Sequence, residues 1–304
     1  MFGEAVETAK KVDEVIVVVG LDQTQEKEER DRIKLTLPGQ QENLVYQVSR
    51  AAKRPVVFVI LSGGPVDVSF AVNDPQISSI IWAGYPGQAG GQALAEIIFG
   101  DYNPGGRLPM TWYPQDFVKI PMTDMNMRPN HDTGYPGRTY RFYTGKKVFE
   151  FGQGLSYSAY SYNFSSTTIQ KIDLNVTMEH FEALGNRGKG HVRVENTPCR
   201  KLKFRSSIFV RNHDKMDGRH AVLLYSKSPA THKGAPQKQL IGFRSVHVQG
   251  KHTAKVTFVV KPCDHFSTVE ENGQRLLAIG SHSLIVGDTQ YPVSLVTKHL
   301  NRNS

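Results

Sequence analysis

Two patterns of apolar residues divide the chain. In residues 1–125, short continuous apolar runs alternate with segments whose apolar residues recur at helical spacing. Such runs are typical of strands buried on both faces, and strands alternating with helices favour a parallel sheet covered by helices. The expected strands are 15–19, 56–61 and 77–82, and the expected helices are 2–12, a segment between Pro38 and Pro55, and 87–99.

From about residue 165 onward the pattern changes to the alternation of an all-β domain. Apolar residues such as Phe204, Ile208 and Val210 alternate with basic ones such as Arg205 and Arg211. Short alternating strands separated by turns predict a β-sandwich. The sequence therefore predicts an α/β domain over 1–125, an ordered linker rich in Pro, Gly and aromatic residues over 126–164, and a β-sandwich over 165–299.

Composition and charge argue against a membrane protein and against a nucleic-acid-binding protein. The 304 residues are 39% apolar and 21% charged, as in ordinary globular proteins, and the apolar runs are shorter than the ~20 residues that span a bilayer. The formal charge is +9, but its basic residues alternate along strands instead of combining with aromatic residues on one face. We expect no nucleic-acid or membrane partner, and rank attraction to acidic polysaccharide below a solvated basic face.

A polar loop at residues 20–32 carries the strongest candidate chemistry. Four carboxylates (Glu26, Glu28, Glu29 and Asp31) lie within six consecutive positions of the loop that follows a buried strand. The carboxyl ends of such strands are where α/β sheets bind ligands. Glu26 and Glu28 would share a face in an extended segment. Crowded or buried carboxyls tend to keep their proton, and such a group can act as a general acid. On the charges alone, a solvated charge run is the more frequent explanation.

Several longer motifs change that weighting. VVVGLD at 17–22, EKEERDR at 26–32 and LTLPGQQ at 35–41 resemble the second domain of glycoside hydrolase family three. They are most similar to its plant β-D-xylosidase/α-L-arabinofuranosidase branch. NPGGRLP at 103–109 and FEFGQGLSY at 149–157 extend the resemblance along the chain. By this resemblance Glu28 is the catalytic acid/base, and Glu29 stands where many relatives have Gly.

The resemblance also implies an architecture and a set of partners. Residues 1–125 would be a partial α/β sandwich with a mainly parallel sheet, and the β-sandwich would be fibronectin type III-like. The family's nucleophile comes from a (β/α)8 barrel, which would be a missing partner of this chain alongside an oligosaccharide substrate; no cofactor is implied. The leading hypothesis is the C-terminal part of a retaining, extracellular β-xylosidase-like hydrolase, inactive alone. The alternative is a non-catalytic sugar-binding or interaction fragment.

The remaining candidates concern secretion and metals. The first residues do not form a signal peptide, although the resemblance implies an extracellular or cell-wall protein. In that compartment Cys199 and Cys263 are expected to form a disulfide, with two buried free thiols as the alternative. Asn163 and Asn175 begin glycosylation sequons. The histidines lack regular ligand spacing, so we interpret them as surface residues and expect no metal site.

Overall fold

A computed structural model describes residues 2–175, 181–183, 190–229, 235–270 and 272–297. The chain forms two compact units, each treated separately below. The first contains the residues up to Asp101 together with Leu108–Asn126 and Thr144–Gln153. The second contains Tyr102–Arg107, Met127–Tyr143 and the chain from Gly154 onward. No helix among the described residues is long and apolar enough to cross a membrane.

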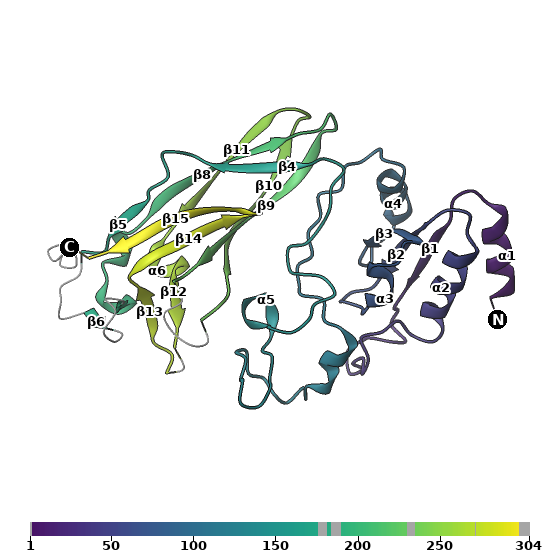
Figure 1. The fold of residues 1–304 in the computed structure, drawn as a ribbon, viewed down its shortest axis with the longest axis horizontal. Coiled ribbons are helices and arrows are strands. Elements are labelled where there is room, and N and C mark those ends of the chain that lie inside the picture. The colour runs from purple at the N-terminus through teal and green to yellow at the C-terminus, as the bar shows by residue number, and fades with distance from the viewer. Residues whose placement is uncertain (1, 176–180, 184–189, 230–234, 271, 298–304) are drawn as a thin grey trace. The chain divides into compact units, whose positions relative to one another are not determined.

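A three-stranded parallel sheet forms the centre of the first unit (Figure 1). Its strands are β1 (Ile16–Gly20), β2 (Val56–Leu61) and β3 (Ile77–Trp82), in the order β1-β2-β3. Both neighbouring pairs are parallel. The sequence predicted these strands to within one residue at each end.

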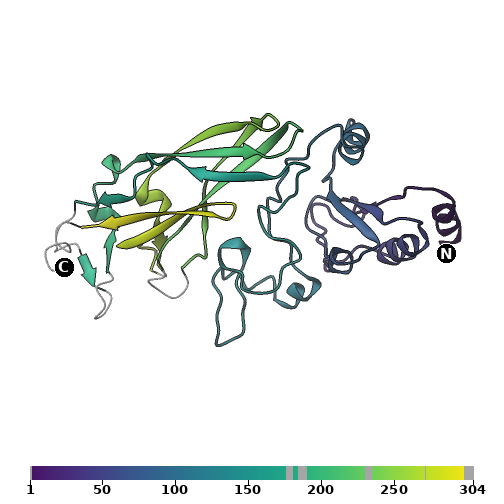
Figure 2. The ribbon, with the colours of Figure 1, turned by 45° about the horizontal axis from the view of Figure 1, so that its top comes forward.

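Helices α1 (Gly3–Lys11) and α2 (Gln41–Ala51) lie side by side next to β1 (Figures 1 and 2). Val45 and Val48 of α2 belong to the same buried cluster as Val17 and Phe58 of the sheet. The opposite face of β1 has less cover, since the side chain of Val18 is 51% exposed. The expected cover on both faces is therefore absent at this strand.

The rest of the first unit closes around two tryptophans. Trp112 is fully buried, and its ring lies 5.8 Å from that of Trp82 and 5.5 Å from that of Phe149. The backbone N–H of Trp112 donates to the Phe149 carbonyl at 2.9 Å, and these two residues form an isolated antiparallel β-bridge. The other elements of this unit are α3 (Ser69–Val72), α4 (Gly90–Ile98) and η1 (Gln115–Lys119).

The second unit is a β-sandwich, whose layers can be followed in Figure 2 with β14 and β15 in yellow. One sheet has the order β10-β9-β14-β15-β5, a second has β11-β8-β4, and a third, at one end, has β12-β13-β7-β6. The strands are β4 (Tyr160–Phe164), β5 (Lys171–Asp173), β6 (Phe181–Ala183), β7 (Gly190–Arg193), β8 (Phe204–Asn212), β9 (Gly218–Lys227), β10 (Gln239–Val248), β11 (Thr253–Val260), β12 (Ser267–Val269), β13 (Arg275–Ala278), β14 (Gly280–Val286) and β15 (Thr289–Val296). The short helices are α5 (Thr139–Phe142), η4 (Val194–Asn196), η5 (Cys199–Lys201) and α6 (Pro262–His265).

The first strand of this sandwich precedes the start expected from the sequence. We placed residues up to 164 in the linker, but β4 pairs with β8 along its whole length, with Tyr162 opposite Val210. Tyr160, Tyr162 and Phe164 also pack against the sandwich core. The last three aromatic residues of the expected linker are therefore the inward-facing positions of a strand.

Two histidines lie inside the sandwich, which corrects the expectation that the histidines are surface residues. His220 is 2% exposed and His282 is fully buried. His220 Nε2 lies 2.5 Å from the Tyr162 hydroxyl, and His282 Nε2 lies 2.8 Å from the Ala278 carbonyl. Burial disfavours the charged imidazolium and lowers the pKa of each histidine to about 4. Both are neutral core residues near neutral pH.

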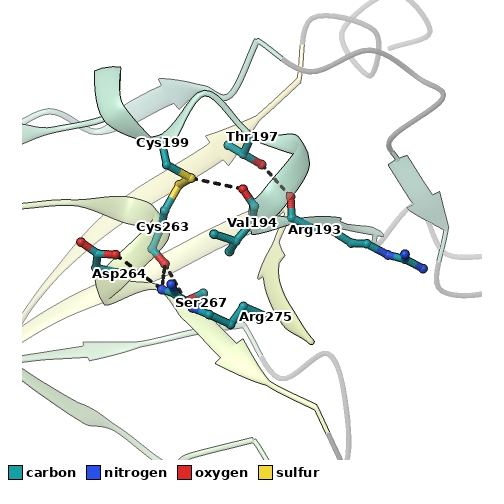
Figure 3. Close-up of a disulfide and its surroundings, with 8 residues drawn as sticks. All are labelled: Arg193, Val194, Thr197, Cys199, Cys263, Asp264, Ser267 and Arg275. Carbon is teal, nitrogen blue, oxygen red and sulfur yellow. Dashed lines mark hydrogen bonds and ion pairs between the residues drawn. A yellow bond between two sulfur atoms is a disulfide. The ribbon is translucent and has the colours of Figure 1, made fainter. Parts of the chain in front are cut away.

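Cys199 and Cys263, the pair named from the sequence, are joined by a disulfide (Figure 3). The bridge links η5 to α6 and closes a loop with a sequence separation of 64. The Cys263 carbonyl accepts hydrogen bonds from the Ser267 hydroxyl at 2.6 Å and from Arg275 Nη2 at 2.5 Å. This covalent link and these hydrogen bonds hold η5, α6 and β13 together.

Candidate active site

The loop with the candidate carboxylates begins where β1 ends. The three strands are parallel, so their carboxyl ends meet at one edge of the sheet. Residues 21–40, 62–68 and 83–89 leave the sheet at that edge. The first of these segments contains Glu28, and its position depends on contacts at its start, middle and end.

The start of the loop is fixed by a glutamine side chain. Gln41, the first residue of α2, donates from Nε2 to the Gly20 carbonyl and accepts from the Gly20 N–H, both at 2.9 Å. The next N–H, that of Leu21, donates to Leu61 of β2 at 2.8 Å. Gly20 lies on the outer strand, so the Gln41 amide takes the place of a further strand at this point.

The end of the loop is fixed by a second glutamine. Gln115 Oε1 accepts from the N–H groups of Leu35 and Thr36, at 2.7 and 3.2 Å. Asp67 completes the junction: its N–H donates to the Leu35 carbonyl at 2.7 Å, and its Oδ2 accepts from the Gln115 N–H at 2.6 Å. Three segments that are distant in the sequence therefore meet where the loop returns to the sheet edge.

The middle of the loop is held by Arg32, whose side chain is only 13% exposed. Arg32 Nε lies 3.1 Å from Glu26 Oε2, and Arg32 Nη2 donates to the Pro65 carbonyl at 3.0 Å. The Glu26 carboxylate thus belongs to a contact that ties the loop to the segment after β2. A partly exposed ion pair adds little stability by itself, but it fixes where Glu26 points.

Glu28 lies at the tip of the loop, in a tight turn. Lys27 and Arg30 form two backbone hydrogen bonds with each other, at 3.0 and 3.2 Å, and Glu28 and Glu29 are the two residues between them. The φ angle of Glu29 is +66°, whereas that of Glu28 is not positive. This combination is typical of a type II turn, in which glycine is preferred at the second position.

The turn changes the relation between Glu26 and Glu28 that the sequence suggested. Glu28 is in a turn and not in an extended segment, so the two carboxylates are not placed on one face by strand alternation. Glu28, Glu29 and Asp31 are all exposed, and within the described residues none has an ion pair or hydrogen bond through its carboxylate. The expected burial is therefore absent in this chain.

Asp22, at the start of the loop, has a different role. Its Oδ1 accepts from the Thr24 hydroxyl at 2.5 Å and from the Thr24 N–H at 2.8 Å. These hydrogen bonds lower the pKa of Asp22, the one to the Thr24 side chain most strongly. Because they stabilise the ionised form, Asp22 is suited to shaping the loop and not to donating a proton.

The conformation of Glu29 leads to a test of the turn. We expect Glu29→Gly to stabilise the first unit by about 0.5–1 kcal/mol, because relief of roughly 1–2 kcal/mol of left-handed strain exceeds the added entropy of the unfolded chain. Both tryptophans of the chain, Trp82 and Trp112, lie in this unit, so tryptophan fluorescence during urea unfolding reports it alone. Glu29→Ala removes the same charge but keeps the strain, and equal stabilities of the two variants would contradict this assignment.

Glutamine and arginine contacts were missed at the sequence level. Gln41 and Arg32 lie within quoted motifs but were given no role, and Gln115 belongs to none of the quoted motifs. A pocket of ≈ 490 Å³ lies along α2, with Tyr46, Arg50 and Asp74 in its lining, and it includes none of the loop carboxylates. Among the residues that the structure describes, no three His, Cys, Asp or Glu side chains gather as metal ligands would.

Comparison with known proteins identifies the family to which the chain belongs. Residues 1–157 match the glycosyl hydrolase family 3 C-terminal domain, and residues 220–290 match the fibronectin type III-like domain. "Probable beta-D-xylosidase 6" of Arabidopsis thaliana is 49% identical in an alignment of 303 residues that covers 97% of this chain and 38% of that protein. "Beta-xylosidase/alpha-L-arabinofuranosidase 2" of Medicago sativa subsp. varia is 46% identical, over 96% of this chain and 38% of that protein.

A solved structure gives the same picture. A GH3 exo-beta-xylosidase, XlnD, in complex with a xylobiose aziridine activity-based probe matches with a TM-score of 0.82 and 32% identity, over 97% of this chain and 38% of that one. The chain thus spans a little over a third of the length of these relatives. It belongs to glycosyl hydrolase family 3, as a C-terminal domain followed by a fibronectin type III-like region.

Proposed function

We propose that the chain is the acid/base-bearing C-terminal part of a retaining β-xylosidase-like enzyme, with Glu28 as the acid/base. The observation that carries the proposal is a carboxylate free of ion pairs among the described residues, at the tip of a loop that Gln41, Arg32 and Gln115 fix to the sheet. A proton donor has to be exposed in this way if a substrate held elsewhere is to reach it. The sequence motif selects Glu28 over Glu29 and Asp31, which are also exposed.

The proposed reaction divides the chemistry between this chain and a (β/α)8 barrel. Retaining hydrolysis needs a nucleophilic carboxylate and a proton donor about 5–5.5 Å apart. The barrel would supply the nucleophile and most sugar contacts, and Glu28 would protonate the leaving oxygen and then activate the water. The names of the relatives favour oligosaccharides of xylan or arabinoxylan as substrates, and the disulfide favours an extracellular or cell-wall location.

The first test compares the chain alone with a hybrid enzyme, defined as this chain joined to the N-terminal part of a plant relative. We expect no measurable turnover of aryl β-xylosides by the chain alone, because an acid without its nucleophile cannot form the glycosyl intermediate. The hybrid enzyme should release the aryl alcohol. Turnover by the isolated chain would contradict the division of labour.

The same comparison separates the alternative, a non-catalytic sugar-binding fragment. In that case the hybrid enzyme would be inactive although folded, and the isolated chain would bind xylo-oligosaccharides in a calorimetric titration. The observation that favours keeping this alternative is the pocket along α2, which is lined by Tyr46 and Arg50 of this helix and by Asp74.

A further inference from the structure

Asn163 lies on an exposed strand position that the catalytic proposal does not use. It belongs to β4, the outer strand in the sheet order β11-β8-β4, and it begins the sequon Asn163-Phe164-Ser165. Phe164 packs against the sandwich core, and its ring centroid lies 5.1 Å from that of Tyr291. Side chains alternate along a strand, so Asn163 points outward. Its amide forms no hydrogen bond with any described residue.

An exposed aromatic ring lies directly beside this asparagine. Asn163 is opposite Phe209 of β8. The Ser165 N–H donates to the Ser207 carbonyl at 2.9 Å. Hydrogen-bonded residue pairs recur at every second position of an antiparallel strand pair, so Asn163 and Phe209 also form such a pair. The Cα atoms of such a pair are about 5.5 Å apart. The Phe209 ring, 37% exposed, is therefore within reach of a group attached to Asn163.

The surroundings of the ring favour a neutral, polar occupant with one apolar face. Lys255 is opposite Phe209 on the other side, with its Nζ 5.9 Å from the ring centroid. The outward positions in the two neighbouring rows include Ser207, Thr257, Ser161, Arg211 and Thr253. A pyranose ring matches this face, because its C–H side can lie on an aromatic ring while its hydroxyls face hydroxyl and cationic side chains.

The disulfide supplies an independent observation. Cys199 and Cys263 are bonded in the same sandwich, and such bridges form in the oxidising secretory compartments in which asparagine is glycosylated. The second sequon lacks comparable support. Asn175 is exposed, but Val176 and Thr177 lie outside the described residues.

We propose that Asn163 is an N-glycosylation site and that the first sugar of its glycan packs on Phe209. In the transfer, Asn163 Nδ2 forms a bond to the anomeric carbon of an oligosaccharide carried on a lipid diphosphate. The bond from that carbon to the diphosphate oxygen breaks, the amide loses one proton, and the lipid diphosphate leaves. No electron transfer is involved. The attached sugar then covers the one aromatic side chain among the outward positions of β4 and β8.

Occupancy is the first test. The full chain is secreted from a yeast or plant host behind a heterologous signal peptide, and tryptic glycopeptides are analysed by mass spectrometry. We expect a hexose- and N-acetylhexosamine-bearing peptide that contains Asn163, which Asn163→Gln and Ser165→Ala should each abolish. A secreted protein whose Asn163 peptide is entirely unmodified would overturn the proposal.

Packing on Phe209 is tested by a thermal cycle in an Asn175→Gln background. An endoglycosidase trims the glycan to one sugar, and the melting of the sandwich is followed by far-UV circular dichroism. The one-sugar form should melt about 2–4 °C above Asn163→Gln, and Phe209→Ala should remove this difference. Phe243, an exposed phenylalanine of β10 in the other sheet, gives the control Phe243→Ala, which should leave it unchanged. A difference that survives Phe209→Ala would refute the packing.

Discussion

Glu28→Gln in the hybrid enzyme should slow the hydrolysis of xylobiose by about 10²–10⁴-fold, the usual contribution of a positioned general acid–base group. Xylose is a poor leaving group, so its oxygen has to be protonated as the bond to the anomeric carbon breaks. Glutamine fills the same space at the tip of the turn but cannot donate a proton. Steady-state rates with xylobiose give the size of the effect.

The leaving group separates a missing proton from a misplaced loop. A dinitrophenyl xyloside needs little protonation, so Glu28→Gln should still release a rapid burst of dinitrophenol in pre-steady-state measurements. The second step, attack of water on the glycosyl intermediate, should remain slow because it also uses Glu28. A variant that lost the burst as well would have lost the arrangement of the site and not the proton donor.

Two neighbouring glutamates provide matched controls. Glu26 pairs with Arg32, so Glu26→Gln should loosen the loop and lower the rate less than about tenfold. Glu29 shares the tip of the turn with Glu28, and Glu29→Gln should change the rate still less. A larger loss for either control than for Glu28→Gln would assign the acid/base to the wrong glutamate.

Removing the Cys199–Cys263 disulfide should destabilise the β-sandwich by about 4 kcal/mol. The bridge closes a loop with a sequence separation of 64, and the loss of unfolded-chain entropy for a loop of this length has that size. The double variant Cys199→Ala/Cys263→Ala should therefore shift the urea unfolding transition seen by far-UV circular dichroism to lower urea. Thiol counting under denaturing, non-reducing conditions should find no free thiol in the unaltered secreted protein.

Two controls show whether the destabilisation is confined to the β-sandwich and comes from the disulfide: the fluorescence of the two tryptophans and the variant Ser267→Ala. Tryptophan fluorescence reports only the first unit, so its transition should stay where it is in the double variant. Ser267→Ala keeps the bridge but removes the hydrogen bond to the Cys263 carbonyl, and should cost only about 1 kcal/mol. If the double variant costs no more than Ser267→Ala, the bridge does not constrain the unfolded chain as argued here.

Elements with a strong local pattern could be predicted from the sequence. The run that became β2 is apolar at every position and follows Pro55, and its predicted and observed ends agree. The strand β4 was missed although its aromatic and polar residues alternate, because it directly follows a segment rich in Pro, Gly and aromatic residues and its partner β8 is distant in the sequence.

The candidate site could be located by motif but not described. The motif pointed to Glu28, whereas the position of its loop depends on the side chains of Gln41 and Gln115. Their amides form hydrogen bonds with backbone groups 21 and 80 residues away in the sequence. Contacts of this kind have no local signature. The positive φ of Glu29 is visible only once the turn is formed, and the buried histidines were misjudged because polarity alone does not reveal burial.

The place of β5 in the sandwich sets an order for folding on the ribosome. Among the strands that the structure describes, β5 is hydrogen-bonded to β15 alone, with Asp173 opposite Val296. During synthesis, β5 therefore cannot form its strand pair until β15, about 120 residues later, has been made. This delay is roughly 6–25 s at usual elongation rates. The three-stranded sheet of the first unit needs no residue beyond Trp82 for its strand pairs, so it can form while the sandwich is still being translated.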